Sequence, residues 1–308
     1  MSNKMKAIIL GKNGSLDNLE IKEQSIPELL PQQVLIKVTA CGINPVDWKA
    51  ILHGGFKLPY VVGSDISGTV IKTGAAVTKF NAGDEVIGSL NWDKQGAFAE
   101  YVTTETTCIL KKPVNISLAE AAAIPMAGLT AWQGLFDILQ LQRGQKILIH
   151  AAAGGVGIFA LQLAKWKGAY VAVTASLKNH SILVSLGADE VIDYQSHDFS
   201  KILKNFDAVF DSVAATEKSY QVLKPGGRYV SITEISQPLS AALSESYGII
   251  ARKFLFKADA EQLQQIVALI EKGKLKLFID STFYFTDIRR ALEYQKEGHS
   301  RGKNILII

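Results

Sequence analysis

A glycine-containing turn near the middle of the chain has the residue types and spacing of a phosphate-binding loop. Residues 147–157 pass from an apolar strand pattern through Ala152, Gly154 and Gly157 into a helical pattern. This fits the dinucleotide fingerprint with alanine in its first glycine position. Gly154 would let the backbone approach a pyrophosphate, and Gly157 would let helix and strand pack closely. The N–H groups at the start of the helix would face the phosphates.

The turn therefore predicts a dinucleotide site, although an ordinary tight turn between strand and helix has the same spacing. The residues expected to contact the cofactor here are Ala153, Gly154, Gly155, Val156 and Gly157.

The residues after the next strand pattern favour NADPH over NADH. An NAD site places Asp or Glu there, to accept hydrogen bonds from the ribose 2′-hydroxyl. The chain has no acidic residue between Gly157 and Asp189. Ser176 and Asn179 can instead donate hydrogen bonds to a 2′-phosphate, and Lys178 can supply positive charge, although a solvated lysine at a helix start is the commoner case.

Strands and helices alternate around this turn, which predicts βαβ units and a parallel sheet. The strand patterns cover 146–152, 170–175, 190–194, 207–213 and 228–233. The helix patterns cover 155–167, 179–186 and 216–223, and a turn is expected at Pro225-Gly226-Gly227. Ser212 and Val213 lie at the carboxyl end of the strand pattern 207–213 and complete the expected cofactor contacts.

The two ends of the chain have other patterns. Residues 1–110 contain short β-branched runs with Gly, Pro and Asn between them, which predicts an all-β unit. Ser117-Leu118-Ala119-Glu120 is a capping box ahead of a helix. Residues 259–271 predict an amphipathic helix, and 304–308 predict an apolar strand that could pair with the N-terminal β unit.

Composition excludes several classes of protein. With 48% apolar and 20% charged residues the chain is expected to be globular and not disordered. A net charge of +4 on scattered lysines lacks the clustered basic footprint of a nucleic-acid-binding protein. No apolar run is long enough for a membrane span, and no signal-peptide core is present. Two distant cysteines suggest a reducing compartment, so a cytoplasmic protein is expected.

The turn Ala151–Gly157 resembles the Ala-x-x-Gly-x-Val-Gly turn of medium-chain dehydrogenases/reductases. Further segments in the same order extend the resemblance over nearly the whole chain. They are Asn44-Pro45-Val46-Asp47, Gly63–Gly68, Gly96–Tyr101, Gly187-Ala188-Asp189, Leu223–Gly227 and Gly302-Lys303. The first is similar to the Asn-Pro-x-Asp segment of quinone oxidoreductases. The chain most resembles the zinc-free branch of quinone oxidoreductase homologues and enone reductases.

The resemblance implies an α/β fold with a GroES-like β domain and a Rossmann doubly wound parallel sheet. Residues 1–123 and 258–308 would form the GroES-like domain, and residues 124–257 the NADPH-binding Rossmann domain. Substrate and nicotinamide would meet in the cleft. By residue match, Tyr194 would also approach the 2′-phosphate and Thr130 the nicotinamide end. The resemblance also implies a homodimer joined through the edge of the Rossmann sheet.

The resemblance further implies that the chain binds no zinc. Zinc-dependent relatives take a Cys and a His ligand from two of these segments, where this chain has Asn44 and Ser64. Neither residue type is a normal zinc ligand. Two cysteines cannot form a four-cysteine structural site, and the five histidines show no ligand spacing. Cys41 is interpreted as a small buried residue.

Without a metal to polarise an alcohol, the expected reaction is hydride addition to a quinone or to the β-carbon of an α,β-unsaturated carbonyl. Charge would then develop on the carbonyl oxygen, where positioned donors can stabilise it. Lys49 and Asn44 are the candidates, the alternatives being a surface lysine and a loop- or cofactor-holding asparagine. Asp47 and Asp65 are interpreted as structural and not as an acid–base pair.

Flat apolar acceptors suit aromatic linings, although aromatic residues are more often plain core. The candidate pocket residues are Trp48, Phe56, Tyr60 and Trp92. Two other functions remain open, a cofactor-binding regulatory protein with vestigial activity and an enoyl-thioester reductase.

Overall fold

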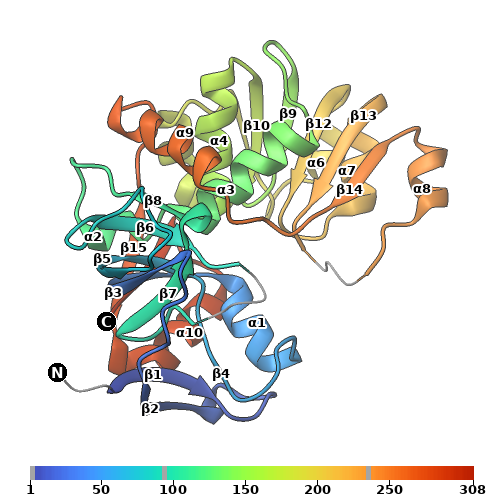
Figure 1. Ribbon diagram of the computed structural model, residues 1–308. Helices are drawn as coiled ribbons and strands as arrows, with labels where there is room; N and C mark the ends of the chain where they lie inside the picture. Colours follow the sequence, from blue (N-terminus) through green and yellow to red (C-terminus); the bar gives the residue numbers. More distant parts are fainter. Residues whose placement is uncertain (1–3, 92–95, 234–236) are drawn as a thin grey trace. The chain divides into compact units, whose positions relative to one another are not determined.

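The computed structural model describes residues 4–91, 96–233 and 237–308, and the chain divides into two compact units (Figure 1). Unit 1 comprises Met1–Leu129 and Lys257–Ile308, and unit 2 comprises Thr130–Phe256. The first division lies inside helix α3 (Pro125–Trp132), whereas the sequence placed it at 123/124. A helix that continues across a division leaves no loop or change in composition to mark it.

Unit 1 is built mainly from antiparallel strands. Their bounds are β1 (Lys4–Leu10), β2 (Leu19–Ser25), β3 (Gln33–Ile43), β4 (Tyr60–Val61), β5 (Asp65–Thr73), β6 (Glu85–Ser89), β7 (Tyr101–Glu105), β8 (Ile109–Lys111), β15 (Ile279–Tyr284) and β16 (Lys303–Ile307). One sheet has the order β2-β1-β4, and the other has the order β15-β16-β3-β5-β6-β8, with β7 also paired to β3.

The C-terminal strand returns to this unit. β16 pairs antiparallel with β3, with Asn304 opposite Ile43 and Ile307 opposite Ala40. The prediction that the terminal strand rejoins the N-terminal β unit is therefore confirmed. The position of β16 beside β3 brings residues from opposite ends of the chain together.

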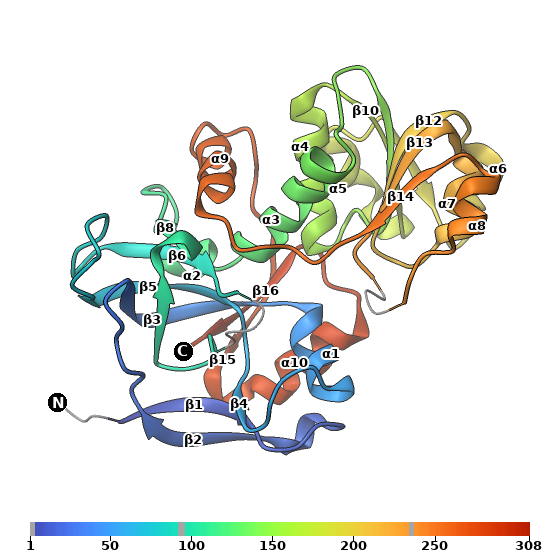
Figure 2. The same ribbon diagram turned by 45° about the vertical axis from the view of Figure 1, so that its right-hand side comes forward.

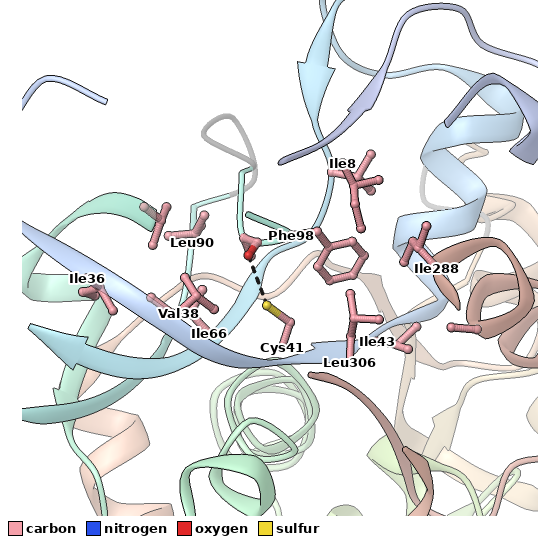
Figure 3. Packing of buried hydrophobic residues seen from close by; sticks show 14 of the residues in the cluster. Ile8, Ile36, Val38, Cys41, Ile43, Ile66, Leu90, Phe98, Ile288 and Leu306 are labelled. Atoms are coloured by element: carbon pink, nitrogen blue, oxygen red, sulfur yellow. Dashed lines mark hydrogen bonds between the residues drawn. The ribbon is translucent and has the colours of Figure 1, made fainter. Parts of the chain in front are cut away.

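The core of unit 1 lies between these strands, as Figure 3 shows. The ring of Phe98 packs among apolar side chains that include Ile8 and Leu306. Cys41 is fully buried here, and its Sγ donates a hydrogen bond to the Ala97 carbonyl at 3.1 Å. Burial raises the pKa of the Cys41 thiol, so this cysteine stays protonated and is part of the core.

Helix α1 (Pro45–His53) corrects the expectation of an all-β unit in residues 1–110. Asn44 is its N-cap residue, Pro45 occupies the first helical position, and the Asp47 carboxylate accepts a hydrogen bond from the Asn44 N–H at 2.7 Å. Proline at the first position and a side chain that closes back on the N-cap are helix-start signals. The Asn-Pro-x-Asp segment is thus the start of a helix.

The other helices of unit 1 are short or lie at its C-terminal end. They are α2 (Leu118–Ala121), α9 (Ala260–Glu271), α10 (Ile288–Glu297) and the 3₁₀ turns Leu16–Asn18, Thr106–Cys108 and Phe285–Asp287. The predicted capping box is confirmed, because the Ser117 N–H donates to the Glu120 carboxylate and the Glu120 N–H donates to the Ser117 hydroxyl. Asp259 caps α9 by accepting from the N–H groups of Glu261 and Gln262.

Unit 2 contains a parallel sheet with the strand order β11-β10-β9-β12-β13-β14. Its strands are β9 (Lys146–Ile149), β10 (Tyr170–Ala175), β11 (Glu190–Asp193), β12 (Phe206–Asp211), β13 (Leu223–Ser231) and β14 (Ile250–Lys253). Its helices are α4 (Gly155–Lys167), α5 (His180–Ser185), α6 (Phe199–Ile202), α7 (Thr216–Val222), α8 (Ala241–Ser246), the π-helix Gln133–Ile138 and the 3₁₀ turn Leu177–Asn179. The order reverses beside β9, as in a Rossmann sheet.

Figure 2 shows α7 and α8 beside β13 and β14, and α4 and α5 near β10. The predicted bounds of α4 and β10 are confirmed. The turn expected at residues 225–227 lies instead inside β13, where the register against β12 shifts between Phe206 and Ala208. Gly226 has φ of +76° within this irregularity, so the glycine pair marks a break in the ladder and not the end of the strand.

Candidate active site

The cofactor candidates of unit 2 lie at one edge of its sheet. β9 leads into the glycine turn, Ser176 follows β10, Tyr194 follows β11, and Ser212 and Val213 follow β12. These strands are parallel and in register, with Ala175 opposite Asp193. Because the carboxyl ends of parallel strands share an edge, the structure brings these residues together where dinucleotides bind in such sheets. Thr130 lies in α3, at the division between the units.

The two glycines of the turn differ in what surrounds them. A Cβ on Gly157 would lie 2.4 Å from the Ala151 carbonyl oxygen and 2.6 Å from the Cα of Ala152, so helix and strand approach too closely for any side chain. A Cβ on Gly154 would meet nothing closer than the same carbonyl oxygen at 3.4 Å. Gly154 begins α4 as its N-cap residue. The open space above it fits a pyrophosphate held by backbone N–H groups.

His150, directly after β9, links the glycine turn to neighbouring elements by hydrogen bonds. It is buried, its Nδ1 lies 2.9 Å from Thr174 Oγ1, and its Nε2 lies 3.0 Å from Ser219 Oγ. Ser212 Oγ donates to the His150 carbonyl oxygen at 3.0 Å. Burial lowers the pKa of the imidazole, with the Asp211 charge opposing, so His150 is a neutral cross-link between neighbouring elements. Sequence reasoning considered it only as a metal ligand.

The loop after β12 is fixed by a buried carboxylate. Asp211 Oδ1 accepts from the Val213 N–H at 2.7 Å, and Oδ2 accepts from the Tyr229 hydroxyl at 2.7 Å. Burial and the Asp211 charge raise the pKa of Tyr229, which therefore stays a donor. The Val213 side chain is half exposed. The backbone of this loop is thus held in place, with the Val213 side chain exposed and the Ser212 hydroxyl bonded to the glycine turn.

The end of β10 carries no carboxylate. Lys178 and Tyr194 are exposed there, and Asn179 Nδ2 donates to Ser176 Oγ at 3.3 Å. The acid on the neighbouring strand end is Asp193, which accepts from Ser196 Oγ at 2.7 Å and the Gln195 N–H at 3.2 Å. The Asp193 carboxylate therefore accepts hydrogen bonds from the turn that follows β11. The side chains at the end of β10 are thus a hydroxyl, an amide and an ammonium group, with no acid among them.

The substrate candidates of unit 1 lie on α1 and in the segment that follows it. Lys49 is exposed, with its Nζ 5.6 Å from the centroid of the Trp48 ring. The rings of Phe56 and Tyr60 are 4.8 Å apart, and Trp48 and Tyr60 pack against the core. Burial and the Asp47 charge raise the pKa of Tyr60 to about 12. The remaining candidate, Trp92, lies outside the described residues.

Two of these aromatic residues have a buried polar atom without a hydrogen-bond partner among the described residues. Trp48 Nε1 and the Tyr60 hydroxyl are buried and make no hydrogen bond to any residue that the structure describes. A buried donor without a partner is costly unless water or a ligand satisfies it. Both groups can therefore donate to a polar acceptor next to α1.

Asn44 lies in a buried polar cluster with Asp65 and Lys303, which sequence reasoning did not connect. Lys303 Nζ donates to the Ile43 carbonyl oxygen at 2.9 Å and to Asn44 Oδ1 at 2.5 Å. Asn44 Nδ2 donates to Asp65 Oδ2 at 3.0 Å and to the Gly42 carbonyl oxygen at 3.3 Å. Both amide hydrogens of Asn44 are thus engaged. To donate a hydrogen bond to a developing anion, the Asn44 amide would have to break its bond to Asp65 or to the Gly42 carbonyl oxygen.

Asp47 and Asp65 both accept hydrogen bonds from the backbone. Asp65 Oδ1 accepts from the Met126 N–H at 2.9 Å, as Asp47 Oδ2 does from the Asn44 N–H. Burial raises the pKa of Asp65 while Lys303 opposes the shift. Burial raises the pKa of Asp47 to about 7, against the Asn44 hydrogen bond and the Lys303 charge. These contacts support the interpretation of the two carboxyl groups as structural.

The raised pKa of Asp47 predicts a pH dependence of stability. Between the ordinary value of 3.8 and about 7 the unfolded chain is ionised while the folded protein keeps the proton. Stability therefore falls as pH rises through this window and levels off above it. Asp47→Asn does not titrate and retains an acceptor for the Asn44 N–H. Chemical denaturation at pH 5, 6, 7 and 8 should show the variant gaining a few kcal/mol relative to the parent as pH rises; a constant difference would contradict the shift.

Within residues 4–91, 96–233 and 237–308, no three His, Cys, Asp or Glu side chains are grouped so that they could hold a metal ion. Among these same residues, no helix has the length and hydrophobicity that crossing a bilayer requires.

Comparison with known proteins gives the class of the fold. Residues 30–114 match the family model of the alcohol dehydrogenase GroES-like domain, and residues 186–306 match that of the zinc-binding dehydrogenase. A quinone oxidoreductase structure from Coxiella burnetii has a TM-score of 0.94 at 35% identity, covering 99% of both chains. A GroES-like domain joined to a Rossmann sheet, as the sequence predicted, is the architecture of a dehydrogenase or reductase.

The curated relatives narrow this class. The chain is 37% identical to 2-methylene-furan-3-one reductase of Solanum lycopersicum, over 98% of this chain and 79% of that protein. It is 35% identical to the chloroplastic NADPH-dependent alkenal/one oxidoreductase of Arabidopsis thaliana, with the same coverage. The chain belongs to the medium-chain dehydrogenase/reductase family, in its quinone oxidoreductase branch, a family of oxidoreductases that bind a nicotinamide cofactor.

Proposed function

We propose that this protein is an NADPH-dependent reductase of quinones or α,β-unsaturated carbonyl compounds that works without zinc. The observation that carries the proposal is the edge of the unit 2 sheet, where an open glycine turn adjoins a strand end with donors and no carboxylate. Relatives named for alkenal/one, furanone and quinone substrates support the acceptor class.

NADPH would be held by the backbone of Ala153–Gly157, with Ser176, Lys178, Asn179 and Tyr194 around its 2′-phosphate. Ser212, Val213 and Thr130 would lie toward the nicotinamide. When bound, the cofactor supplies a hydride to the acceptor. The protein's own contribution is to orient the acceptor, to exclude water and to stabilise the charge that develops on it.

For an enone, hydride adds to the β-carbon and the electron pair moves to the carbonyl oxygen as an enolate, which then takes a proton at the α-carbon. Lys49 is exposed on α1 and has donors free to reach such an oxygen, whereas the amide of Asn44 is engaged in the buried cluster. We therefore assign Lys49 the role of donor to the anion and give Asn44 the supporting role. Trp48, Phe56 and Tyr60 would bind the flat acceptor.

Zinc is not needed for this reaction, because the acceptor is already activated for hydride addition. The positions that match zinc ligands in relatives hold Asn44 and Ser64, whose amide and hydroxyl groups are not normal zinc ligands. The homodimer through the Rossmann sheet edge and the cytoplasmic location stay predictions.

Replacement of Lys49 tests the assignment of the donor. Lys49→Met should lower the turnover number by about 30-fold, because a hydrogen bond to a charged group contributes ~2 kcal/mol and its loss raises the activation barrier by that amount. The dissociation constant of NADPH should not change, because the cofactor candidates lie in unit 2. Lys57→Met, which removes another exposed lysine from the segment after α1, is the matched control. Equal turnover of the two variants would remove Lys49 from the mechanism.

The two alternatives are separated by a substrate panel. Purified protein with NADPH is given small quinones, short and long enones, and an enoyl thioester of coenzyme A. Turnover confined to the thioester would make the protein an enoyl-thioester reductase. Tight NADPH binding without any turnover would favour a cofactor-binding regulatory protein.

A further inference from the structure

Lys303 is a buried cation that the proposed reaction does not use. Its side chain is 6% exposed, and Nζ contacts the Ile43 carbonyl oxygen, Asn44 Oδ1 and, at 3.7 Å, Asp65 Oδ2. An unpaired buried charge would be strongly destabilising, so these contacts are required for the lysine to be tolerated. Burial lowers the pKa of Lys303, and the charges of Asp65 and Asp47 oppose this.

The backbone around Gly302 directs the lysine inward. Gly302 has φ of +89°, and a Cβ there would lie 2.1 Å from the Phe278 carbonyl oxygen. The next residue, Lys303, donates its N–H to this same oxygen at 2.9 Å. A glycine is thus required immediately before the lysine, which gives a physical reason for the Gly-Lys pair at the start of β16.

The cluster allows the Asn44 amide only one orientation. An ammonium group can only donate and an ionised carboxylate can only accept. Asn44 must therefore turn its oxygen to Lys303 and its nitrogen to Asp65, as observed. A flipped amide would place NH₂ against the ammonium group and oxygen against the carboxylate. Asn44 is also the N-cap residue of α1, and the exposed Lys49 follows it five positions later in the same helix.

We propose that Lys303 is a positioning residue that orients the side chain of Asn44, the N-cap residue of α1, and thereby fixes the N-terminus of the helix that carries Lys49. The C-terminal strand thus sets the geometry of a helix whose sequence lies near the other end of the chain. The effect on turnover rests on the proposed function, whereas the orientation of Asn44 does not.

The test compares Lys303→Met, which keeps the length of the side chain but removes its donors, with Lys296→Met, an exposed lysine on α10. Lys303→Met should lower the turnover number with a small enone by on the order of 10-fold, since small displacements of a reacting group are costly. The dissociation constant of NADPH should be unchanged. Lys296→Met should match the parent. Unchanged turnover of a folded Lys303→Met protein would overturn the proposal.

A double variant separates positioning from charge balance. Lys303→Met leaves Asp65 buried without its counter-ion and lowers the melting temperature. Lys303→Met/Asp65→Asn removes both charges, so the melting temperature should recover while turnover stays low, because no ammonium–carboxylate pair is left to hold the Asn44 amide in one orientation. Recovery of turnover together with stability would show that only charge balance matters. The double variant also serves if the single variant does not fold.

A readout without substrate keeps the two proposals distinct. In the full-length parent, the Asn44 side-chain amide protons should exchange slowly with water in NMR spectra, and quickly in Lys303→Met. Rapid exchange in the parent would overturn the positioning role. If the parent reduces no acceptor while these protons are protected, the proposed function fails and the orientation of Asn44 by Lys303 stands.

Discussion

Gly157→Ala is expected to weaken NADPH binding and to destabilise unit 2. The added Cβ would lie 2.4 Å from the Ala151 carbonyl oxygen and 2.6 Å from the Ala152 Cα, so α4 must move away from the end of β9. Both neighbours are backbone atoms, which cannot turn aside as a flexible side chain can. Overpacking of this kind costs about 3 kcal/mol, and the displacement removes the helix N-terminus from the phosphate position.

Gly154→Ala is the matched control for this prediction. Its Cβ would meet only the Ala151 carbonyl oxygen, at 3.4 Å, so the fold should be unaffected. The methyl group would instead occupy the space assigned to the pyrophosphate. Chemical denaturation should therefore separate the two variants, with Gly157→Ala unstable and Gly154→Ala close to the parent, while NADPH titration shows weakened binding in both. Full NADPH affinity in Gly154→Ala would place the pyrophosphate elsewhere.

Ser176→Asp is expected to reverse the cofactor preference. A carboxylate at the end of β10 would repel a 2′-phosphate, and juxtaposed like charges cost several kcal/mol. The same carboxylate would accept hydrogen bonds from the 2′-hydroxyl of NADH. The weaker binding of NADPH and the stronger binding of NADH together should change the ratio of their kcat/KM values by on the order of 1,000-fold.

The measurement is kcat/KM for each cofactor at a saturating concentration of one enone. Ser185→Asp on α5 introduces the same charge at an exposed residue away from the strand end and should leave the ratio unchanged. If Ser176→Asp still prefers NADPH as strongly as the parent does, the 2′-phosphate does not bind at this strand end.

Local patterns in the sequence predicted much of unit 2. The turn 151–157 and the helix 155–167 follow from residues adjacent in the chain, where glycine spacing and apolar periodicity act directly. The pairing of the terminal strand was also foreseen, because an apolar strand at the end of the chain must find a partner. In these cases the structure is determined either by residues close together in the sequence or by the need to bury an apolar strand.

The cluster of Asn44, Asp65 and Lys303 could not be predicted in this way. Its members come from three distant segments, and each alone has an ordinary surface or turn explanation. Only the pairing of β16 with β3 brings them together. Helix α1 is a different case. Its start signal, Asn44-Pro45 with Asp47, was present in the sequence, but the surrounding strand patterns outweighed it.

The central claim is tested most directly by NADPH oxidation in purified protein with a short-chain enone, and with NADH in a parallel reaction. The account predicts formation of the saturated ketone, with one NADPH consumed for each product and kcat/KM for NADPH at least about 100-fold above that for NADH. Product formation should persist after treatment with a strong zinc chelator. Equal use of both cofactors, or loss of activity on chelation that zinc restores, would contradict the account.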